Sequence, residues 1–170
     1  MIDLSSYIRD VPDFPKPGIV FKDVTPLLRD PEALRAAMRL LTDRVAAHKP
    51  DLVVGVESRG FIFGAAVADR LGAGFAPARK PGKLPHLCVR EDYALEYGSG
   101  TLEMHADRLD GKRAVVIDDL LATGGTAACA ARLCRRLGAA VVGFAFVIEL
   151  SALGGRAALD DAPVDSLLIY

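Results

Sequence analysis

Two adjacent carboxylates followed by a glycine-rich turn give residues 114–126, AVVIDDLLATGGT, the strongest potential for chemistry in this chain. The apolar run 114–117 is typical of a strand buried on both faces. Asp118 and Asp119 follow it directly, and a helical pattern of apolar residues begins after the turn. The turn itself contains Ala122, Thr123, Gly124, Gly125 and Thr126. The predicted order is therefore strand, acidic pair, glycine turn and helix.

This order of elements suits a sugar phosphate. Backbone N–H groups can approach a ligand closely at glycines, and the first turn of a helix offers unpaired N–H donors to a phosphate. Ionised carboxylates only accept hydrogen bonds, so Asp118 and Asp119 fit sugar hydroxyls or a metal rather than the phosphate itself. A ribose 5-phosphate carries both kinds of group. The patterns GxxxxGK[ST] and GxGxxG are absent, which disfavours a nucleoside triphosphate or a dinucleotide.

Two further segments place charged or small residues after a predicted strand. Residues 57–60, Glu-Ser-Arg-Gly, follow the apolar run 52–56 and precede a helical pattern, which makes them a second candidate anion site. Arg79, Lys80 and Lys83 follow the next short strand. Clustered cations at a strand end suit a diphosphate, although solvated turn charges would produce the same local pattern.

Predicted strands alternate with predicted helices along the chain. The expected strands are 52–56, 74–78, 114–117, 140–148 and 165–170. One of the helices begins at Pro31 behind Asp30, a good N-cap. The alternation predicts a single α/β domain over residues 1–170, with a parallel sheet covered by helices on both faces. Right-handed crossovers then bring the loops after the strands to one edge, where ligands bind in such sheets.

Composition limits the partners and the location of the protein. A chain of 170 residues with 51% hydrophobic residues and a net charge of −1 predicts a globular domain with no general field for nucleic acid or an anionic membrane. The N-terminus has no signal-peptide core, and no apolar run approaches the length of a membrane span. Cys88, Cys129 and Cys134 lack CxxC spacing, and we expect Cys129 and Cys134 to be small buried residues of a helix. An odd number of cysteines without a signal peptide suggests a reducing cytoplasm.

The segment DDLLATGGTA resembles the phosphoribosyl pyrophosphate (PRPP) motif of type I phosphoribosyltransferases, in the form found in those that act on adenine. The resemblance implies the fold of this family, an α/β twisted parallel sheet flanked by helices with an N-terminal hood, residues 1–30, and a flexible β-hairpin flap, residues 81–109. It also implies that Asp118 and Asp119 hold the ribose 2- and 3-hydroxyls. Loop 122–126 would then hold the 5-phosphate.

Two more segments are similar to the pyrophosphate-binding parts of the same family. GVESRGFIFG, residues 55–64, is similar to the pyrophosphate loop and implies a non-proline cis peptide at Glu57–Ser58. RKPGKLP, residues 79–85, is similar to the start of the flap, although the family often has a basic residue where Pro81 stands. The implied pyrophosphate-binding residues are Glu57, Ser58, Arg59, Arg79, Lys80 and Lys83.

The hood and the flap complete the implied site. PDFPKPGIVFKD, residues 12–23, resembles the hood, and its prolines predict that residues 1–30 are irregular. The implied adenine contacts are Val20, Phe21, Lys22 and Leu150, and a packing role fits Leu150 equally well. YALEYGSGTLEMH, residues 93–105, resembles the flap and is predicted to be a hairpin that turns at residues 98–100. The implied catalytic residues are Glu96, Tyr97 and Arg59.

The resemblance implies transfer of the 5-phosphoribosyl group from PRPP to adenine, giving AMP and pyrophosphate in purine salvage. Glu96 would accept the N9 proton, unless positioning alone carries the reaction. Mg²⁺ is the implied cofactor, held mainly by PRPP and water with no direct protein ligand, and a homodimer is the implied assembly. Two alternatives stay open: a different base, such as hypoxanthine or xanthine, and a non-catalytic regulator that senses PRPP and binds nucleic acid. The charge balance disfavours the regulator.

Overall fold

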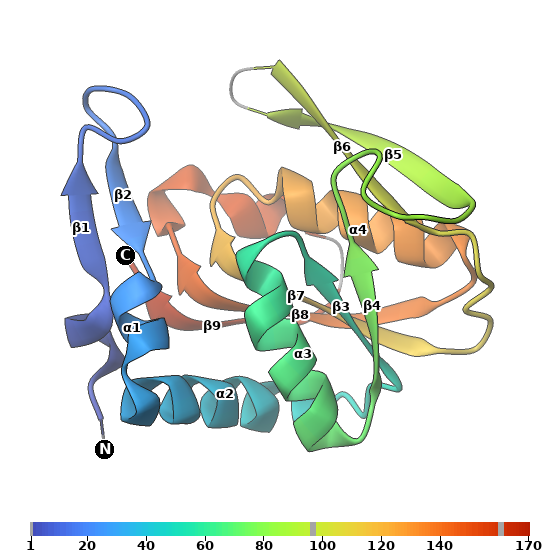
Figure 1. The fold of residues 1–170 in the computed structure, drawn as a ribbon, viewed down its shortest axis with the longest axis horizontal. Coiled ribbons are helices and arrows are strands. Elements are labelled where there is room, and N and C mark those ends of the chain that lie inside the picture. The colour runs from blue at the N-terminus through green and yellow to red at the C-terminus, as the bar shows by residue number, and fades with distance from the viewer. Residues whose placement is uncertain (1, 96–97, 160–161) are drawn as a thin grey trace.

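A five-stranded parallel sheet forms the centre of the molecule in the computed structural model, which describes residues 2–95, 98–159 and 162–170 (Figure 1). The strand order is β4-β3-β7-β8-β9, and every neighbouring pair is parallel. The strands are β3 (Leu52–Val56), β4 (Gly74–Ala78), β7 (Arg113–Leu121), β8 (Ala140–Glu149) and β9 (Val164–Ile169). The predicted α/β architecture is confirmed, and β7 extends four residues beyond the predicted apolar run.

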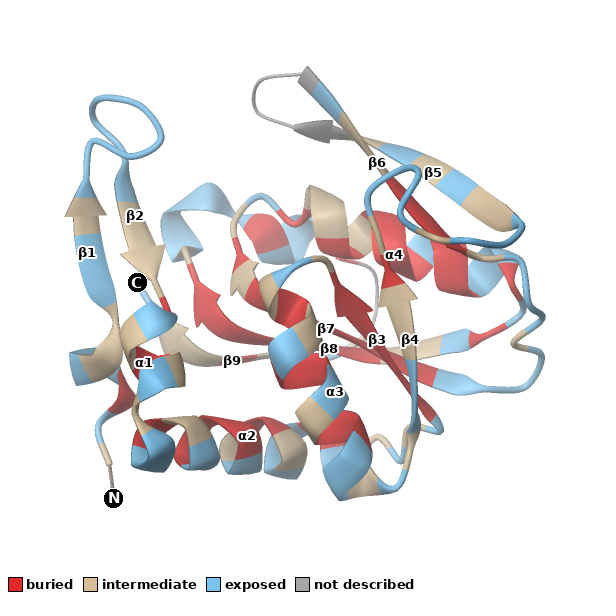
Figure 2. Cartoon of the chain, viewed as in Figure 1, coloured by how far each residue is buried: buried red, intermediate tan, exposed pale blue. Residues whose placement is uncertain are grey.

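Helices cover both faces of the sheet, as the uninterrupted apolar strands require. Helices α2 (Pro31–Ala46) and α3 (Arg59–Leu71) pack on one face, and α4 (Gly125–Arg136) packs on the other. Alternate residues of β8 serve the two faces: Phe144 and Phe146 join the cluster under α4, whereas neighbouring Ala145 and Val147 join the cluster under α2 and α3. Figure 2 shows the resulting buried strands between partly exposed helices.

The helix boundaries follow from local chemistry. The side chain of Asp30 accepts hydrogen bonds from the N–H groups of Glu32 and Ala33 at 3.0 and 2.9 Å, which confirms the predicted cap of α2. Helix α3 ends at Gly72, whose φ of 65° is the left-handed conformation that glycine adopts most easily. No helix among the described residues is long and apolar enough to cross a membrane.

The prediction that residues 1–30 are irregular is wrong. This segment forms a 3₁₀ helix η1 (Leu4–Tyr7), an antiparallel hairpin of β1 (Arg9–Pro12) and β2 (Val20–Asp23), and the short helix α1 (Thr25–Arg29). The prolines occupy positions that tolerate them. Pro12 ends a strand, and Pro26 lies in the first turn of α1, where a missing N–H breaks no helical bond.

A second hairpin consists of β5 (Cys88–Leu95) and β6 (Gly98–His105), which form their own antiparallel sheet. The hairpin itself was predicted, but its turn was misplaced. Leu95 pairs with Gly98, so residues 98–100 belong to β6. Gly100 lies opposite Tyr93, and a Cβ at this glycine would overlap the tyrosine ring. The glycine therefore serves a close cross-strand contact rather than a turn.

The two hairpins stand on either side of the sheet edge at which β3 and β4 end (Figure 1). Two 3₁₀ turns, η2 (Ser151–Leu153) and η3 (Gly155–Ala158), connect β8 to β9 near the same edge. The fold thus gathers its irregular segments around the carboxyl ends of the strands, where the predicted anion loops also lie.

Phe146 tests the core between β8 and α4. Its side chain is fully buried, so we expect Phe146→Ala to lower the free energy of unfolding by about 3–5 kcal/mol through lost burial and a cavity. Urea denaturation monitored by circular dichroism measures this change. Leu153→Ala, at a side chain that is 45% exposed, is the control and should stay within about 0.5 kcal/mol of the parent protein. Equal effects of the two changes would contradict the assigned core.

Candidate functional site

The loops after β3, β4 and β7 meet at one cleft of about 360 Å³. The cleft combines both carboxylates of the acidic pair with the glycine turn and with residues from the other two loops. Its lining consists of Glu57, Ser58, Arg59, Lys80, Tyr93, Asp118, Asp119, Leu120, Leu121, Ala122, Thr123, Gly124, Gly125, Thr126 and Ala127. Segments about 60 residues apart in the sequence are therefore brought together as predicted.

The acidic pair lies on the last part of β7. Asp119 is only 5% exposed, and its Oδ2 accepts a hydrogen bond of 2.5 Å from Nε of Arg59. The N–H of Asp119 donates to Oδ1 of Asp118 at 2.8 Å. Burial, reinforced by the negative charge of Asp119, raises the pKa of Asp118 well above its ordinary value. The two carboxyl groups thus differ: one is neutralised by arginine, and the other carries an unfavourable charge.

A glycine at the start of α3 allows this arrangement. A Cβ on Gly60 would lie 2.8 Å from Oδ1 of Asp118 and 2.9 Å from the carbonyl oxygen of Ile117. The first turn of α3 can therefore approach the end of β7 only because residue 60 has no side chain. This approach also brings Arg59 within reach of Asp119. The peptide between Glu57 and Ser58 is cis, as the resemblance implied.

The glycine turn leads directly into α4, which begins at Gly125. Gly124 has a φ of 82°, and a Cβ there would overlap the carbonyl oxygen of Gly155. A Cβ on Gly155 would in turn overlap the carbonyl oxygen of Ala122. The turn is therefore packed against the η3 segment, and the first N–H groups of α4, which have no helical acceptors, border the cleft.

An arginine–glutamate pair fixes the η3 segment that supports this turn. Nε and Nη2 of Arg156 each donate to a different carboxylate oxygen of Glu149 at 2.7 Å, and Nη1 donates to the carbonyl of Val164. Hydrogen bonds from Arg156 hold the pKa of Glu149 below its ordinary value although burial opposes the charge. This bidentate pair, in which Glu149 is buried and Arg156 is about half exposed, joins the end of β8 and the start of β9 to η3.

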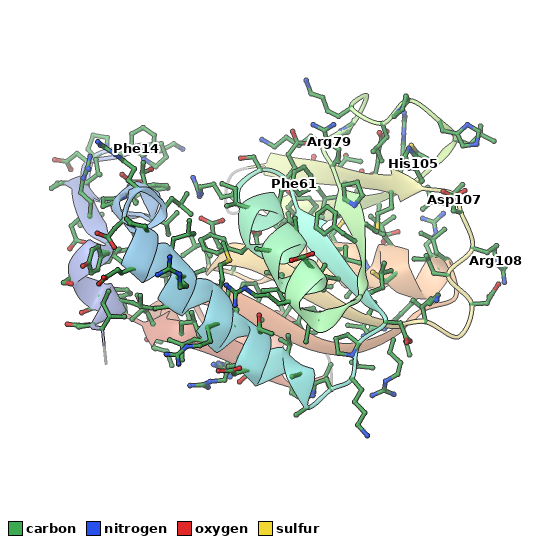
Figure 3. All side chains as sticks on the ribbon, turned by 60° about the horizontal axis from the view of Figure 1, so that its bottom comes forward. Phe14, Phe61, Arg79, His105, Asp107 and Arg108 are labelled. Carbon is green, nitrogen blue, oxygen red and sulfur yellow. The ribbon has the colours of Figure 1, made fainter. Side chains whose placement is uncertain are left out.

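The implied pyrophosphate residues divide into two groups. Glu57, Ser58, Arg59 and Lys80 line the cleft, whereas Arg79 and Lys83 do not. Nε and Nη2 of Arg79 instead donate to the two oxygens of Glu57 at 3.2 Å, and its Nη1 donates to the carbonyl of Lys83. The guanidinium carbon of Arg79 lies 5.7 Å from the ring centre of Phe61, and both residues are labelled in Figure 3. The Lys80 N–H also donates to Glu57 at 3.0 Å.

The bonds to Glu57 have an electrostatic consequence. Burial by itself would raise the pKa of this carboxyl, but the hydrogen bonds from Arg79 and from the backbone of Lys80 outweigh it and leave the pKa lowered. Glu57 therefore stays ionised and connects the loop after β3 to the loop after β4.

None of the implied adenine residues, Val20, Phe21, Lys22 and Leu150, lines the cleft itself. Two of them adjoin it. The guanidinium carbon of Arg59 lies 5.3 Å from the ring centre of Phe21, and the N–H of Leu150 donates to the carbonyl of Leu121 at 2.9 Å. The Lys22 ammonium pairs with Asp10 at 2.7 Å, and the side chain of Val20 is exposed.

The sequence analysis missed four residues of the cleft, Tyr93, Leu120, Leu121 and Ala127. Leu120, Leu121 and Ala127 adjoin the predicted motif, so their position beside it was the available signal. Tyr93 comes from β5, and its approach depends on how the β5–β6 hairpin folds over the sheet. Glu96 and Tyr97 lie outside the described residues.

Comparison with known proteins identifies the family. The phosphoribosyl transferase domain matches residues 23–168. The chain belongs to the phosphoribosyltransferase family. A relative from Synechococcus sp. (strain CC9902), named adenine phosphoribosyltransferase, is 59% identical over 171 residues, which are 99% of this chain and 98% of the relative. The family's type I fold, with its central parallel sheet, is confirmed.

Solved structures of adenine phosphoribosyltransferases are similar over nearly the whole chain. The protein from Thermoanaerobacter pseudethanolicus superposes with a TM-score of 0.95 at 47% identity and 98% coverage of both chains. The protein from Saccharomyces cerevisiae, solved with D-2,5-dideoxy-2,5-imino-altritol 1,6-bisphosphate and adenine, has a TM-score of 0.87 at 41% identity and 96% coverage of both chains.

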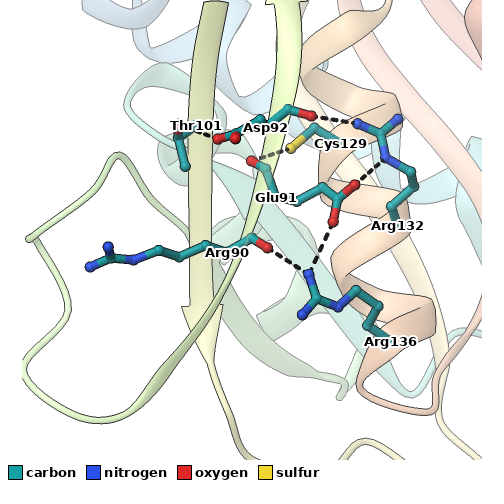
Figure 4. Close-up of polar contacts among 7 residues, drawn as sticks. All are labelled: Arg90, Glu91, Asp92, Thr101, Cys129, Arg132 and Arg136. Atoms are coloured by element: carbon teal, nitrogen blue, oxygen red, sulfur yellow. Dashed lines mark hydrogen bonds and ion pairs between the residues drawn. The ribbon is translucent and has the colours of Figure 1, made fainter.

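In this phosphoribosyltransferase the base of the β5–β6 hairpin is bound to α4, the helix that begins at the glycine turn (Figure 4). Glu91 accepts hydrogen bonds from Arg132 at 2.8 Å and from Arg136 at 3.1 Å. The same arginines donate to the backbone carbonyls of Asp92 and Arg90 at 3.0 and 2.6 Å. Tyr93 therefore enters the cleft from a strand that is attached to the helix behind the glycine turn.

The raised pKa of Asp118 predicts a stability gain on neutralisation. The folded protein favours the protonated form of this carboxyl. The charge of Asp118 therefore has no destabilising effect below the ordinary pKa of 3.8. The effect grows as the pH rises from 3.8 to the higher pKa of the folded protein, and it is complete above that pKa. We expect Asp118→Asn to raise Tm at pH 8, by an amount that shrinks toward pH 3.5.

Thermal unfolding monitored by circular dichroism across this pH range makes the measurement. Asp43→Asn, at an exposed position of α2, is the matched control and should leave Tm unchanged within about 1 °C. An Asp118→Asn variant that is less stable than the parent at pH 8 would show that the carboxylate charge stabilises the fold.

Proposed function

We propose that this chain transfers the 5-phosphoribosyl group from PRPP to adenine, producing AMP and pyrophosphate in purine salvage. The observation that carries the proposal is the shared cleft: acceptors for a sugar diol, donors for a terminal phosphate and cations for a diphosphate line the same cavity. The full-length similarity to adenine phosphoribosyltransferases supports the choice of reaction.

The ribose phosphate binds to β7 and the turn behind it. Asp118 and Asp119 accept hydrogen bonds from the 2- and 3-hydroxyls, since ionised carboxylates have only acceptors. The 5-phosphate lies against the N–H groups and hydroxyls of loop 122–126, where the N-terminus of α4 adds a favourable dipole. The carboxylates repel the phosphate, so the two ends of the sugar cannot exchange places.

The pyrophosphate binds across the cleft beside Ser58, Arg59 and Lys80. One of the five guanidinium donors of Arg59 binds Asp119, which leaves others for the leaving group. Glu57 and Arg79 act through the loops that they join, and Lys83 contributes from the loop after β4. Cations at this position stabilise the charge that develops as the diphosphate leaves.

Adenine binds between Phe21 and the cleft, with Leu150 behind it. Strand β2 has only β1 as a partner within the described sheets, so the backbone groups on its free edge near Val20 and Lys22 can read the adenine edge. A neutral purine offers both donors and acceptors to such groups. The Lys22 side chain is held by Asp10, which is consistent with a backbone role for this residue.

Mg²⁺ is the proposed cofactor. The carboxylates of Asp118 and Asp119 line the cleft and are of the ligand type that Mg²⁺ accepts, and this ion commonly takes its remaining ligands from substrate phosphates and water. When bound, it would neutralise charge on the diphosphate.

Adenine N9 forms a bond to ribose C1 while the bond from C1 to the pyrophosphate oxygen breaks. Positive charge develops on the sugar, and the neighbouring carboxylates of Asp118 and Asp119 favour it. The N9 proton passes to a base, for which Glu96 is the proposed acceptor. The hood, residues 1–30, and the flap, residues 81–109, would exclude water, with Glu96 and Tyr97 approaching the sugar as the flap closes. The homodimer and the cytoplasmic location stay predictions.

A turnover screen of free purine bases tests the proposed reaction. With PRPP and Mg²⁺ present, we expect adenine to be converted to AMP, and hypoxanthine to react with a kcat/KM at least about 100-fold lower, because its 6-oxo group accepts where adenine donates. Chromatography of the nucleotide products makes the measurement. Comparable turnover of hypoxanthine would contradict the specificity, and no product from any base would contradict the reaction.

The acidic pair is tested by the double change Asp118→Asn/Asp119→Asn. We expect kcat/KM for PRPP to fall by at least about 100-fold, because the diol loses its charged acceptors and the developing cation loses two negative neighbours. The matched control is Asp43→Asn/Asp69→Asn, which removes two exposed carboxylates from α2 and α3. Parent rates in the cleft variant would remove the acidic pair from the proposed site.

A further inference from the structure

Glu103 is a fully buried acidic residue that the proposed mechanism does not use. It lies in β6, its side chain is 1% exposed, and it does not line the cleft. Burying an ionised carboxylate is costly unless hydrogen bonds and an opposite charge compensate it. The partners of Glu103 therefore indicate what its position stabilises.

Those partners belong mainly to the loop after β4. Oε2 of Glu103 accepts a hydrogen bond of 3.0 Å from the N–H of Gly82. The backbone N–H of Glu103 donates to the carbonyl of Arg79 at 2.7 Å, and the Arg79 N–H donates to the carbonyl of Glu103 at 2.9 Å. Backbone and side chain of one residue thus bind both sides of the turn that contains Lys80.

The second carboxylate oxygen of Glu103 has an ion pair as its main contact. Oε1 of Glu103 forms an ion pair of 2.5 Å with Nε of Arg90 but accepts no hydrogen bond of good geometry within the described part of the chain. Arg90 is a largely exposed side chain of β5. Its backbone carbonyl accepts the bond from Arg136 of α4 that Figure 4 shows. The contacts of Glu103 therefore continue into the helix behind the glycine turn.

Several contacts hold the turn at residues 79–83. Gly82 has a φ of 76°, a conformation that glycine after Pro81 adopts readily in a tight turn, and outside its chain neighbours no atom lies within 4 Å of where its Cβ would be. The side chain of Arg79 donates to the carbonyl of Lys83 at 3.0 Å. The hydrogen bond from the Gly82 N–H to the buried carboxylate of Glu103 adds a contact at the exposed middle of the turn.

We propose that Glu103 is a positioning residue for diphosphate binding: it holds the turn at residues 79–83 so that Lys80 points into the cleft. The inference rests on the proposed function only in taking the ligand of Lys80 to be the diphosphate of PRPP. Glu103 acts through the turn and touches no substrate. The competing explanation, a purely structural ion pair, predicts a loss of stability without a selective effect on diphosphate.

The test compares Glu103→Ala with Glu103→Gln. Pyrophosphate affinity is measured by titration calorimetry, and KM for PRPP, KM for adenine and kcat by AMP formation. We expect Glu103→Ala to weaken pyrophosphate binding and raise KM for PRPP by about 10-fold, with KM for adenine changed less than about twofold. Glu103→Gln keeps an oxygen that can accept the Gly82 N–H, so it should recover both values to within about threefold of the parent.

Gly82→Ala provides an independent variant if Glu103→Ala fails to fold. Alanine disfavours the positive φ but meets no neighbouring atom, so the change acts on the turn alone. It should show the same selective loss, and combination with Glu103→Ala should add little, because both changes release the same turn. Arg90→Lys is the matched control: it keeps a positive charge beside Oε1 and the acceptor for Gly82, and should leave pyrophosphate affinity within about twofold.

Folded Glu103→Ala and Gly82→Ala variants that bind pyrophosphate like the parent would overturn the inference while leaving the proposed function intact. An equal rise in KM for PRPP and for adenine would also overturn it, in favour of a general structural role. A parent protein that binds pyrophosphate but makes no AMP would overturn only the proposed reaction. A parent protein that binds no pyrophosphate would overturn both.

Discussion

Two carboxylates on consecutive residues at the end of a buried strand repel each other, and the cleft is arranged around that repulsion. Asp119 is neutralised by Arg59, which reaches it from the first turn of α3, while Asp118 retains the unfavourable charge. Both effects require α3 to lie close to β7, and Gly60 permits that approach. The raised pKa of Asp118 is therefore a consequence of burial and of placing two carboxylates side by side in the cleft.

Pairs of a glutamate and an arginine recur around the cleft. Buried or half-buried glutamates each bind one arginine and hold one loop: Glu57 binds Arg79, Glu149 binds Arg156, and Glu103 pairs with Arg90. Each carboxylate also accepts from the backbone or supports an arginine that binds a backbone carbonyl. Loops without regular hydrogen bonding thereby gain fixed partners.

Close packing of backbone supplies the other constraint. Gly124 and Gly155 leave no space for a Cβ between the glycine turn and η3. The shape of the glycine turn thus depends on a segment about 30 residues later in the chain. Glu149 and Arg156 bind that segment to the end of β8 and the start of β9, so contacts with the sheet help to position the turn before α4.

Local patterns in the sequence determined the α/β architecture, the order of the anion loops and the cap of α2, because each depends on residues within one or two turns of chain. The irregular N-terminus and the turn at residues 98–100 were wrongly predicted. Proline restricts the backbone and glycine makes it flexible, but neither residue type indicates which distant strand the segment pairs with. Only the tertiary structure decided that Arg59 binds Asp119, that Tyr93 reaches the cleft and that Gly82 is held by Glu103. These contacts join residues 21 to 60 positions apart, or strands whose approach depends on the whole sheet, and no local pattern encodes such a distance.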